Sequence, residues 1–166
     1  MPHSQGSPQQ TTCSAAKPDV QMVLLLVHAA ATMFMVGVIW FVQVVHYPLF
    51  ARVGASGFAG YSWAHSRLTG LVVGPPMLVE AATAVALVVN APPGISVSLV
   101  WIGLVLLAVI WLSTALLQSP RHAELGRGFA SPTHRALVSS NWLRTMLWSL
   151  RGLIVLRILA EAIGKA

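Results

Sequence analysis

The chain has 166 residues, of which 56% are hydrophobic and only 8% are charged, and its formal net charge is +6. About 25% of the residues of a soluble domain are charged, so a soluble fold of this composition would expose large apolar patches. The composition excludes a soluble domain. It predicts an all-α integral membrane protein, with a bundle of four transmembrane helices in residues 21–166.

The positive charge does not point to nucleic acid, because the arginines are scattered among loops and helix ends without a basic stripe interleaved with aromatics. Residues 1–20 are rich in Ser, Gln, Thr and Pro, so we expect a disordered polar tail there. The single cysteine, Cys13, excludes an intrachain disulfide framework and a thiolate metal cage.

The first predicted helix covers residues 21–46 and is long enough to cross a bilayer, which takes about 20 apolar residues. Steps of three or four residues from His28 place several polar side chains on one face of this helix. The face comprises His28, Thr32, Met35, Ile39, Gln43 and His46. Because polar groups cost free energy in lipid, this face should contact partner helices. The helix should end at Pro48.

Three further helices are predicted, over residues 68–89, 97–117 and 137–159. Pro75 and Pro76 should kink the second helix, since a proline inside a helix removes a backbone hydrogen bond. The uncharged segment 90–94, which contains two prolines and a glycine, should form a tight turn.

The segments between these helices set the expected orientation. Segments 51–66 and 118–136 should be loops on one side of the membrane, and with their flanks they hold Arg52, Arg67, Arg121, Arg127 and Arg135. The opposite side has Lys17, Lys165 and Arg157. Arginine-rich loops face the cytoplasm, so the sequence predicts that both chain termini lie outside.

A short pattern occurs twice. Trp40 to Pro48 leads to Gly57-Phe58-Ala59 and His65, and Trp111 to Pro120 leads to Gly128-Phe129-Ala130 and His134. A duplicated helical hairpin with parallel symmetry would produce this pattern, and so would coincidence in a chain so rich in glycine and alanine.

Glu80 is the only acidic residue inside a predicted span, and Arg151 should lie at a similar depth on the last helix. An isolated carboxylate in hydrocarbon would be protonated or paired, so we expect an intramembrane ion pair between the two. Two interpretations stay open: a structural pair that holds two helices in register, or a site for protons or an anionic ligand.

The other candidate residues gather near the expected cytoplasmic boundary. They are Gln43, His46, His65, Arg67, His122, His134, Asn141 and Arg144, joined there by Tyr47 and Gln118. Each histidine could make an ordinary hydrogen bond, or several together could form a ligand pocket, since imidazole also ligates haem iron. His28 lies about 27 Å from His46 along a straight helix, so it would belong to a separate site. The chain has no His-x-x-x-His pair or His-Glu-x-x-His run, so we expect no zinc site.

The motif Trp40-x7-Pro48-x-Phe50, followed by Arg67 and Pro75-Pro76-Met77-Leu78, resembles an uncharacterised group of small bacterial four-helix inner-membrane proteins. More distantly it is similar to the bacterial membrane protoporphyrinogen oxidases. The similarity covers mainly the first two helices, and Leu49 stands where those oxidases have an arginine. The resemblance implies a four-helix fold in the bacterial inner membrane, a bound haem and a tetrapyrrole substrate.

The leading hypothesis is therefore a redox-related or haem- and tetrapyrrole-binding membrane protein and, if an enzyme, a membrane oxidoreductase. One alternative is a small proton-coupled transporter that uses Glu80 and Arg151. Another is a non-catalytic subunit or assembly factor of a membrane complex. The expected partners are the lipid bilayer and a tetrapyrrole or other small ligand, with a homo-oligomer as a further option.

Overall fold

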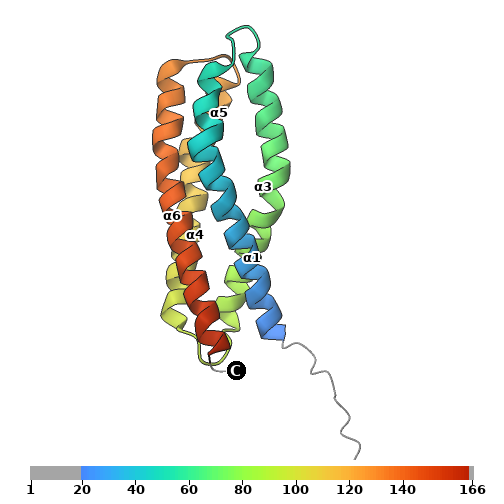
Figure 1. The fold of residues 1–166 in the computed structure, drawn as a ribbon, viewed down its shortest axis with the longest axis vertical. Helices are drawn as coiled ribbons and strands as arrows, with labels where there is room; N and C mark the ends of the chain where they lie inside the picture. Colours follow the sequence, from blue (N-terminus) through green and yellow to red (C-terminus); the bar gives the residue numbers. More distant parts are fainter. Residues whose placement is uncertain (1–19, 165–166) are drawn as a thin grey trace, which may run out of the picture.

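The structure, a computed structural model, describes residues 20–164, and these form a bundle of long helices aligned along one axis (Figure 1). Some expectations concern residues 1–19 and 165–166, which lie outside the described residues. They concern the polar tail, Cys13, Lys17 and Lys165. Val20, expected as the last residue of the tail, is the first residue of a helix.

The described residues form four long helical segments. The first consists of α1 (Val20–Phe41), the π-helix η1 (Val42–His46), α2 (Tyr47–Leu49) and the 3-10 helix η2 (Phe50–Arg52). The second is α3 (Phe58–Val89). The third consists of α4 (Val97–Ser113), the π-helix η3 (Thr114–Gln118) and α5 (Ser119–Leu125). The fourth is α6 (Ser131–Ile163).

The prediction that the first helix ends at Pro48 is wrong, and the third helix likewise continues past Pro120. In both places the proline follows a π-helix and occupies the first turn of the next α-helical stretch. A proline is compatible with the first turn of an α-helical stretch, where its fixed φ suits the helix. Tyr47, which precedes Pro48, keeps helical angles (φ −64°, ψ −42°).

The loops are consequently much shorter than expected. The first connection covers residues 53–57 and the third covers residues 126–130. His65 and Arg67 lie on α3, and His134 and Arg135 lie on α6. His122, also expected in a loop, lies on α5. The tight turn expected at residues 90–94 is present between α3 and α4, and Gly94 adopts a positive φ of 87°, which favours glycine.

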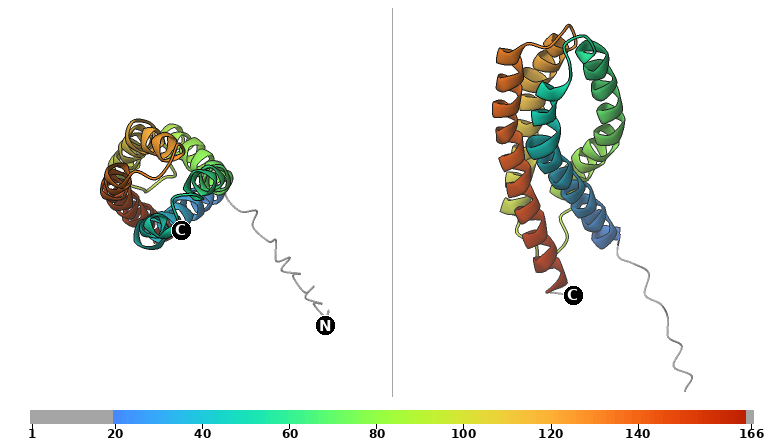
Figure 2. Two further views of the ribbon diagram at one scale, coloured as in Figure 1. Left: turned by 90° about the horizontal axis from the view of Figure 1, so that it is seen from above. Right: turned by 45° about the horizontal axis from the view of Figure 1, so that its top comes forward.

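The helices surround a common axis (Figure 2, left). α1 packs against α3 and α6, and α4 packs against the same two helices. The helices thus form a ring in the order α1, α3, α4, α6, and the pair α1 and α3 occupies one half of the ring while the pair α4 and α6 occupies the other. Each half also has a π-helix just before a proline. The π-helix before a proline thus accompanies the repeated sequence pattern in both halves of the chain.

Apolar and polar layers alternate along the bundle. On α1, buried Leu25 belongs to the first apolar cluster and Met35 to the second, and Phe50 in η2 belongs to the third. Buried Thr32 lies between the first two clusters, and buried Gln43 lies beside the third, next to Val42. Polar side chains are thus held at two separate depths of the core.

Three of the long segments are long and apolar enough to cross a membrane: residues 20–52, 58–89 and 97–125. α6 is less apolar on average because its buried face carries Asn141, Arg144, Thr145 and Arg151. Its exposed residues include Trp142, Leu143, Met146, Leu150, Leu153 and Leu156. Polar residues inside and apolar residues outside are the pattern of a bundle in lipid, so the fold is an integral membrane helical bundle.

α3 is bowed (Figure 2, right). Pro75 and Pro76 lie inside this helix, where each removes a backbone N–H and its hydrogen bond. The N-terminal part of α3 curves away from α1, and the two helices approach each other again further along α3 (Figure 2, right). Residues of both α1 and α3 line the two cavities described below.

Candidate functional site

The polar layer at the depth of Thr32, which we call the lower layer, is built around the Glu80–Arg151 ion pair. The structure forms this pair as the sequence predicts. Arg151 Nε and Nη2 lie 3.0 and 2.9 Å from Glu80 Oε1, and both side chains are buried. Thr32 donates to Oε1 at 2.9 Å, and the Trp148 indole donates to Oε2 at 3.2 Å. Arg151 also donates to the carbonyl of Gly103. The network joins all four long helices.

His28 lies in the same layer. Its Nδ1 is 2.8 Å from Thr83 Oγ1, and that hydroxyl lies 2.7 Å from the Val79 carbonyl. Since the hydroxyl donates to the carbonyl, the assigned tautomer has His28 Nδ1–H donating to Thr83. The cavity beside His28 and Arg151 has a volume of only ≈ 10 Å³, room for about one water. This layer is closed to larger ligands, which favours the structural interpretation of the ion pair.

The upper polar layer contains a much larger cavity, of ≈ 360 Å³. We call it the polar cavity. Its polar lining residues are Tyr47, His65, Ser66, Thr69, Thr114, Gln118, Ser119, His122 and Arg144. Met35, Val38, Ile39, Val42, Gly70 and Val73 complete the wall. Small-molecule sites have volumes of roughly 300–1,000 Å³, so the polar cavity is large enough for a ligand.

Arg144 supplies a buried positive charge to this cavity. One guanidinium nitrogen donates to Asn141 Oδ1 at 3.2 Å, and the group also interacts with Tyr47 and lies 5.1 Å from the Trp148 ring centroid. Its Nε has no hydrogen-bond partner. Within residues 20–164, the ion pairs are Glu80–Arg151 and Arg157–Glu161, so no carboxylate pairs with Arg144. A buried, unpaired cation is costly, and an anionic ligand would relieve that cost.

Tyr47 and His122 form the next part of the wall. The Tyr47 hydroxyl lies 2.9 Å from His122 Nε2. His122 Nδ1 is buried without a partner, and so is Gln118 Oε1 on the preceding turn. Buried polar atoms are normally hydrogen-bonded, so these two atoms are available to a molecule in the cavity.

His65 lies between two other histidines. Its Nδ1 is 2.7 Å from His46 Nε2 and 3.0 Å from the Thr69 hydroxyl, and its ring centroid is 5.5 Å from that of His122. His46 does not line the polar cavity but lies behind His65. The structure therefore brings together His46, His65 and His122, which the sequence places far apart.

Three other predicted site residues link helices. His134 Nε2 lies 2.8 Å from the Tyr47 carbonyl, and Gln43 donates to the Val138 carbonyl at 3.2 Å. The Asn141 amide nitrogen donates to Gln43 Oε1 at 2.8 Å. This bond orients the Asn141 amide, whose Oδ1 accepts a hydrogen bond from Arg144.

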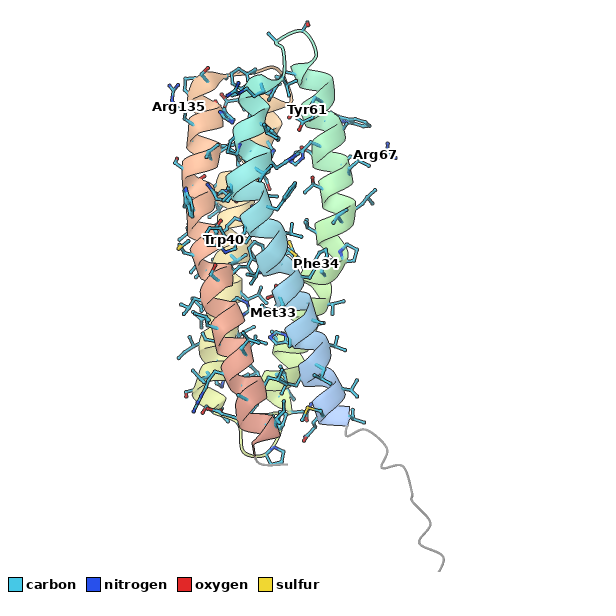
Figure 3. The ribbon with its side chains drawn as sticks, viewed as in Figure 1. Met33, Phe34, Trp40, Tyr61, Arg67 and Arg135 are labelled. Carbon is cyan, nitrogen blue, oxygen red and sulfur yellow. The ribbon has the colours of Figure 1, made fainter. Side chains whose placement is uncertain are left out.

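Arg67 is not brought into this group. Its guanidinium lies 5.6 Å from the Trp63 ring centroid, and the side chain points away from the bundle (Figure 3). Ser66, Thr69 and Thr114, which do line the cavity, were absent from the predicted site. Thr69, four residues after His65, would follow from His65 by helical spacing once α3 is known to begin at Phe58.

In the described part of the chain, no group of three or more His, Cys, Asp or Glu residues is arranged to hold a metal ion. Comparison of the chain with models of known families, with curated proteins and with solved structures finds no match in any of the three.

Proposed function

We propose that this membrane protein binds an acidic, lipophilic ring compound of the tetrapyrrole class in the polar cavity. The observation that supports this most is the buried Arg144 guanidinium, which lines the cavity without a carboxylate partner in the described residues. Arginine binds carboxylates through short, charge-assisted hydrogen bonds, and tetrapyrroles carry carboxylates at one edge.

The residues of the cavity also fit haem. His65 and His122 line the wall, and one nitrogen of His122 is buried without a partner. A haem needs only one or two axial imidazole ligands, so the lack of a three-ligand metal cluster in the described residues is compatible with it. Bound haem would supply one-electron redox chemistry, which is the class of function that the sequence leads us to expect. The chain's own part would be to hold the carboxylates at Arg144 and to orient the ring.

The transporter alternative receives less support from the geometry. Both carboxylate oxygens of Glu80 accept hydrogen bonds, and the adjoining cavity holds no more than about one water. A carrier that used Glu80 and Arg151 would need an open route to this layer.

The test is a haem titration of the detergent-purified protein, followed at the Soret band. Arg144→Gln should weaken binding roughly 10- to 100-fold, because a hydrogen bond to a charged group contributes about 1.5–3 kcal/mol. His122→Ala should also weaken binding. Arg67→Gln is the matched control, since it removes the same charge from an outward-facing side chain, and it should bind like wild type.

Two results would contradict the proposal. One is the absence of a Soret band with the wild-type protein. The other is equal affinity of the wild type, Arg144→Gln and His122→Ala. Circular dichroism of each variant should confirm that the helical bundle is retained.

A further inference from the structure

A second cavity, of ≈ 390 Å³, lies between α1 and α3, and we call it the lateral cleft. Its lining is almost entirely apolar: Gly37, Val38, Phe41, Val42, His46, Leu68, Thr69, Val72 and Val73. Phe41, Leu68 and Val72 are each more than half exposed on the outer surface of the bundle. The lateral cleft therefore opens sideways, onto the surface that lipid covers.

The lateral cleft adjoins the polar cavity. The two share Val38, Val42, Thr69 and Val73 as walls. His46 in the lateral cleft lies 2.7 Å from His65 in the polar cavity, measured between ring nitrogens. A molecule that spanned both would have its apolar part toward lipid and its polar part toward Arg144 and His122.

We infer that the lateral cleft is the lipid-side entrance to the polar cavity and holds the apolar edge of the same ligand. This rests on the proposed function and adds the route and the shape of the ligand to it. Burying an apolar edge against valine side chains is favourable, and burying a carboxylate is favourable only beside a cation such as Arg144. The paired cavities therefore select an amphiphile that dissolves in the bilayer and enters with its acidic end first.

Gly37 offers a way to close the cleft without disturbing the fold. It lines the cleft, and a Cβ added there would meet no atom within 4 Å. Leucine is also a better helix former than glycine, so Gly37→Leu should retain the helix while filling the opening. Gly74 on α3 is equally free of neighbours but lines neither cavity, so Gly74→Leu is the matched control.

The experiment uses the full chain in phosphatidylcholine vesicles that carry dissolved haem, with Soret-band titrations and stopped-flow association rates. Gly37→Leu should lower the haem affinity or the association rate at least about tenfold, because the added side chain occupies space in the cleft that the ligand needs. Gly74→Leu should match the wild type. Gly37→Trp, which fills the cleft more completely, should act at least as strongly as Gly37→Leu.

The failures are distinguishable. No haem binding by the wild type would overturn both the proposed function and this inference. Wild-type binding with unchanged affinity and rate in Gly37→Leu and Gly37→Trp would overturn the lateral entrance alone. A phospholipid that co-purifies with the wild type and is lost from Gly37→Leu, with haem binding unchanged, would assign the cleft to a lipid chain and also overturn the inference.

Discussion

Two arginines on the buried face of α6 have opposite surroundings. Arg151 meets the carboxylate of Glu80 and a backbone carbonyl in a layer with almost no free volume. Arg144 meets an amide oxygen and aromatic groups and lines a cavity of ≈ 360 Å³. The desolvation of a buried charge must be offset by a partner. Arg151 has such a partner and stabilises the fold, whereas a ligand carboxylate would supply the partner that Arg144 lacks.

The ion pair should show strong coupling between its two residues. Glu80→Gln or Arg151→Met alone should lower the free energy of unfolding by roughly 3–5 kcal/mol, because each leaves one buried group unpaired. The double variant should cost clearly less than the sum of the two single changes. Unfolding in mixed micelles with increasing denaturing detergent would measure all four proteins, and strictly additive losses would contradict the coupling.

Arg157 and Glu161 provide the control for this cycle. They form an ion pair at 3.0 Å on α6, but Arg157 is 69% exposed. Exposed pairs contribute about 0–1 kcal/mol, so Arg157→Met should change the free energy of unfolding by less than either buried substitution.

The helices of this bundle contain several local departures from α-helical geometry, and these shape the site. The π-helices before Pro48 and Pro120 let the first and third segments continue, which brings Tyr47 and His122 together. α3 contains Pro75 and Pro76 and is bowed, and it contributes wall residues to both cavities. The polar residues alone would not make a site without these deviations, because a regular bundle packs at crystal-like density.

Replacing Pro75 and Pro76 together by alanine should straighten α3 and narrow the space between α1 and α3. Alanine restores the missing N–H groups and removes a penalty of roughly 3 kcal/mol per proline in a helix interior. Spin labels on cysteines at Phe41 and Leu71, both exposed, should move closer together in pulsed electron paramagnetic resonance. Haem affinity should fall in parallel.

Labels at Val23 and Val85 are the control for this measurement. They lie on the same two helices toward the opposite end of the bundle, and both are exposed. The distance between these two labels should change less than the Phe41–Leu71 distance. All labelled variants carry serine in place of Cys13. An unchanged Phe41–Leu71 distance would show that the prolines do not maintain the bow.

At the scale of the whole molecule, much of the surface is apolar, while three charged residues, Glu80, Arg144 and Arg151, lie in the core. Trp63, Leu68, Leu71, Leu112, Leu116 and Leu153 are each more than half exposed, while Glu80 and Arg151 are buried. Such a surface requires lipid around it. The end of the bundle that carries the connections 53–57 and 126–130 also lies nearest His46, His65 and His122, so the orientation in the membrane decides which compartment the site faces.

The arginine distribution predicts that this end is cytoplasmic. Single cysteines at Ser56 and Ser131 should therefore resist membrane-impermeant maleimide applied to intact cells. Both positions are exposed, so protection would result from the membrane and not from burial. Native Cys13, expected on the outside, is the positive control in the wild type and is replaced by serine in the test variants. Ready labelling of both test positions would show that the topology is the opposite of the predicted one.

The sequence by itself determined the all-α membrane class, the approximate places of the helices, the polar face of the first helix and the Glu80–Arg151 partnership. These follow from the length of apolar runs and from helical spacing, which are local properties of the chain. The helical setting of His122 was not determined, because the rule that a proline ends a helix fails after a π-helix. The early starts of α3 at Phe58 and of α6 at Ser131, and with them the helical setting of His65, were not determined either.

Only the tertiary structure decided which polar residues share a site. Arg144 and Arg67 look alike in the sequence, yet one lies buried at a cavity and the other points outward. Whether a buried charge has a partner depends on side chains from other helices, whose rotation and depth no spacing within one helix specifies. The bow of α3 and the paired cavities beside it depend likewise on packing between helices.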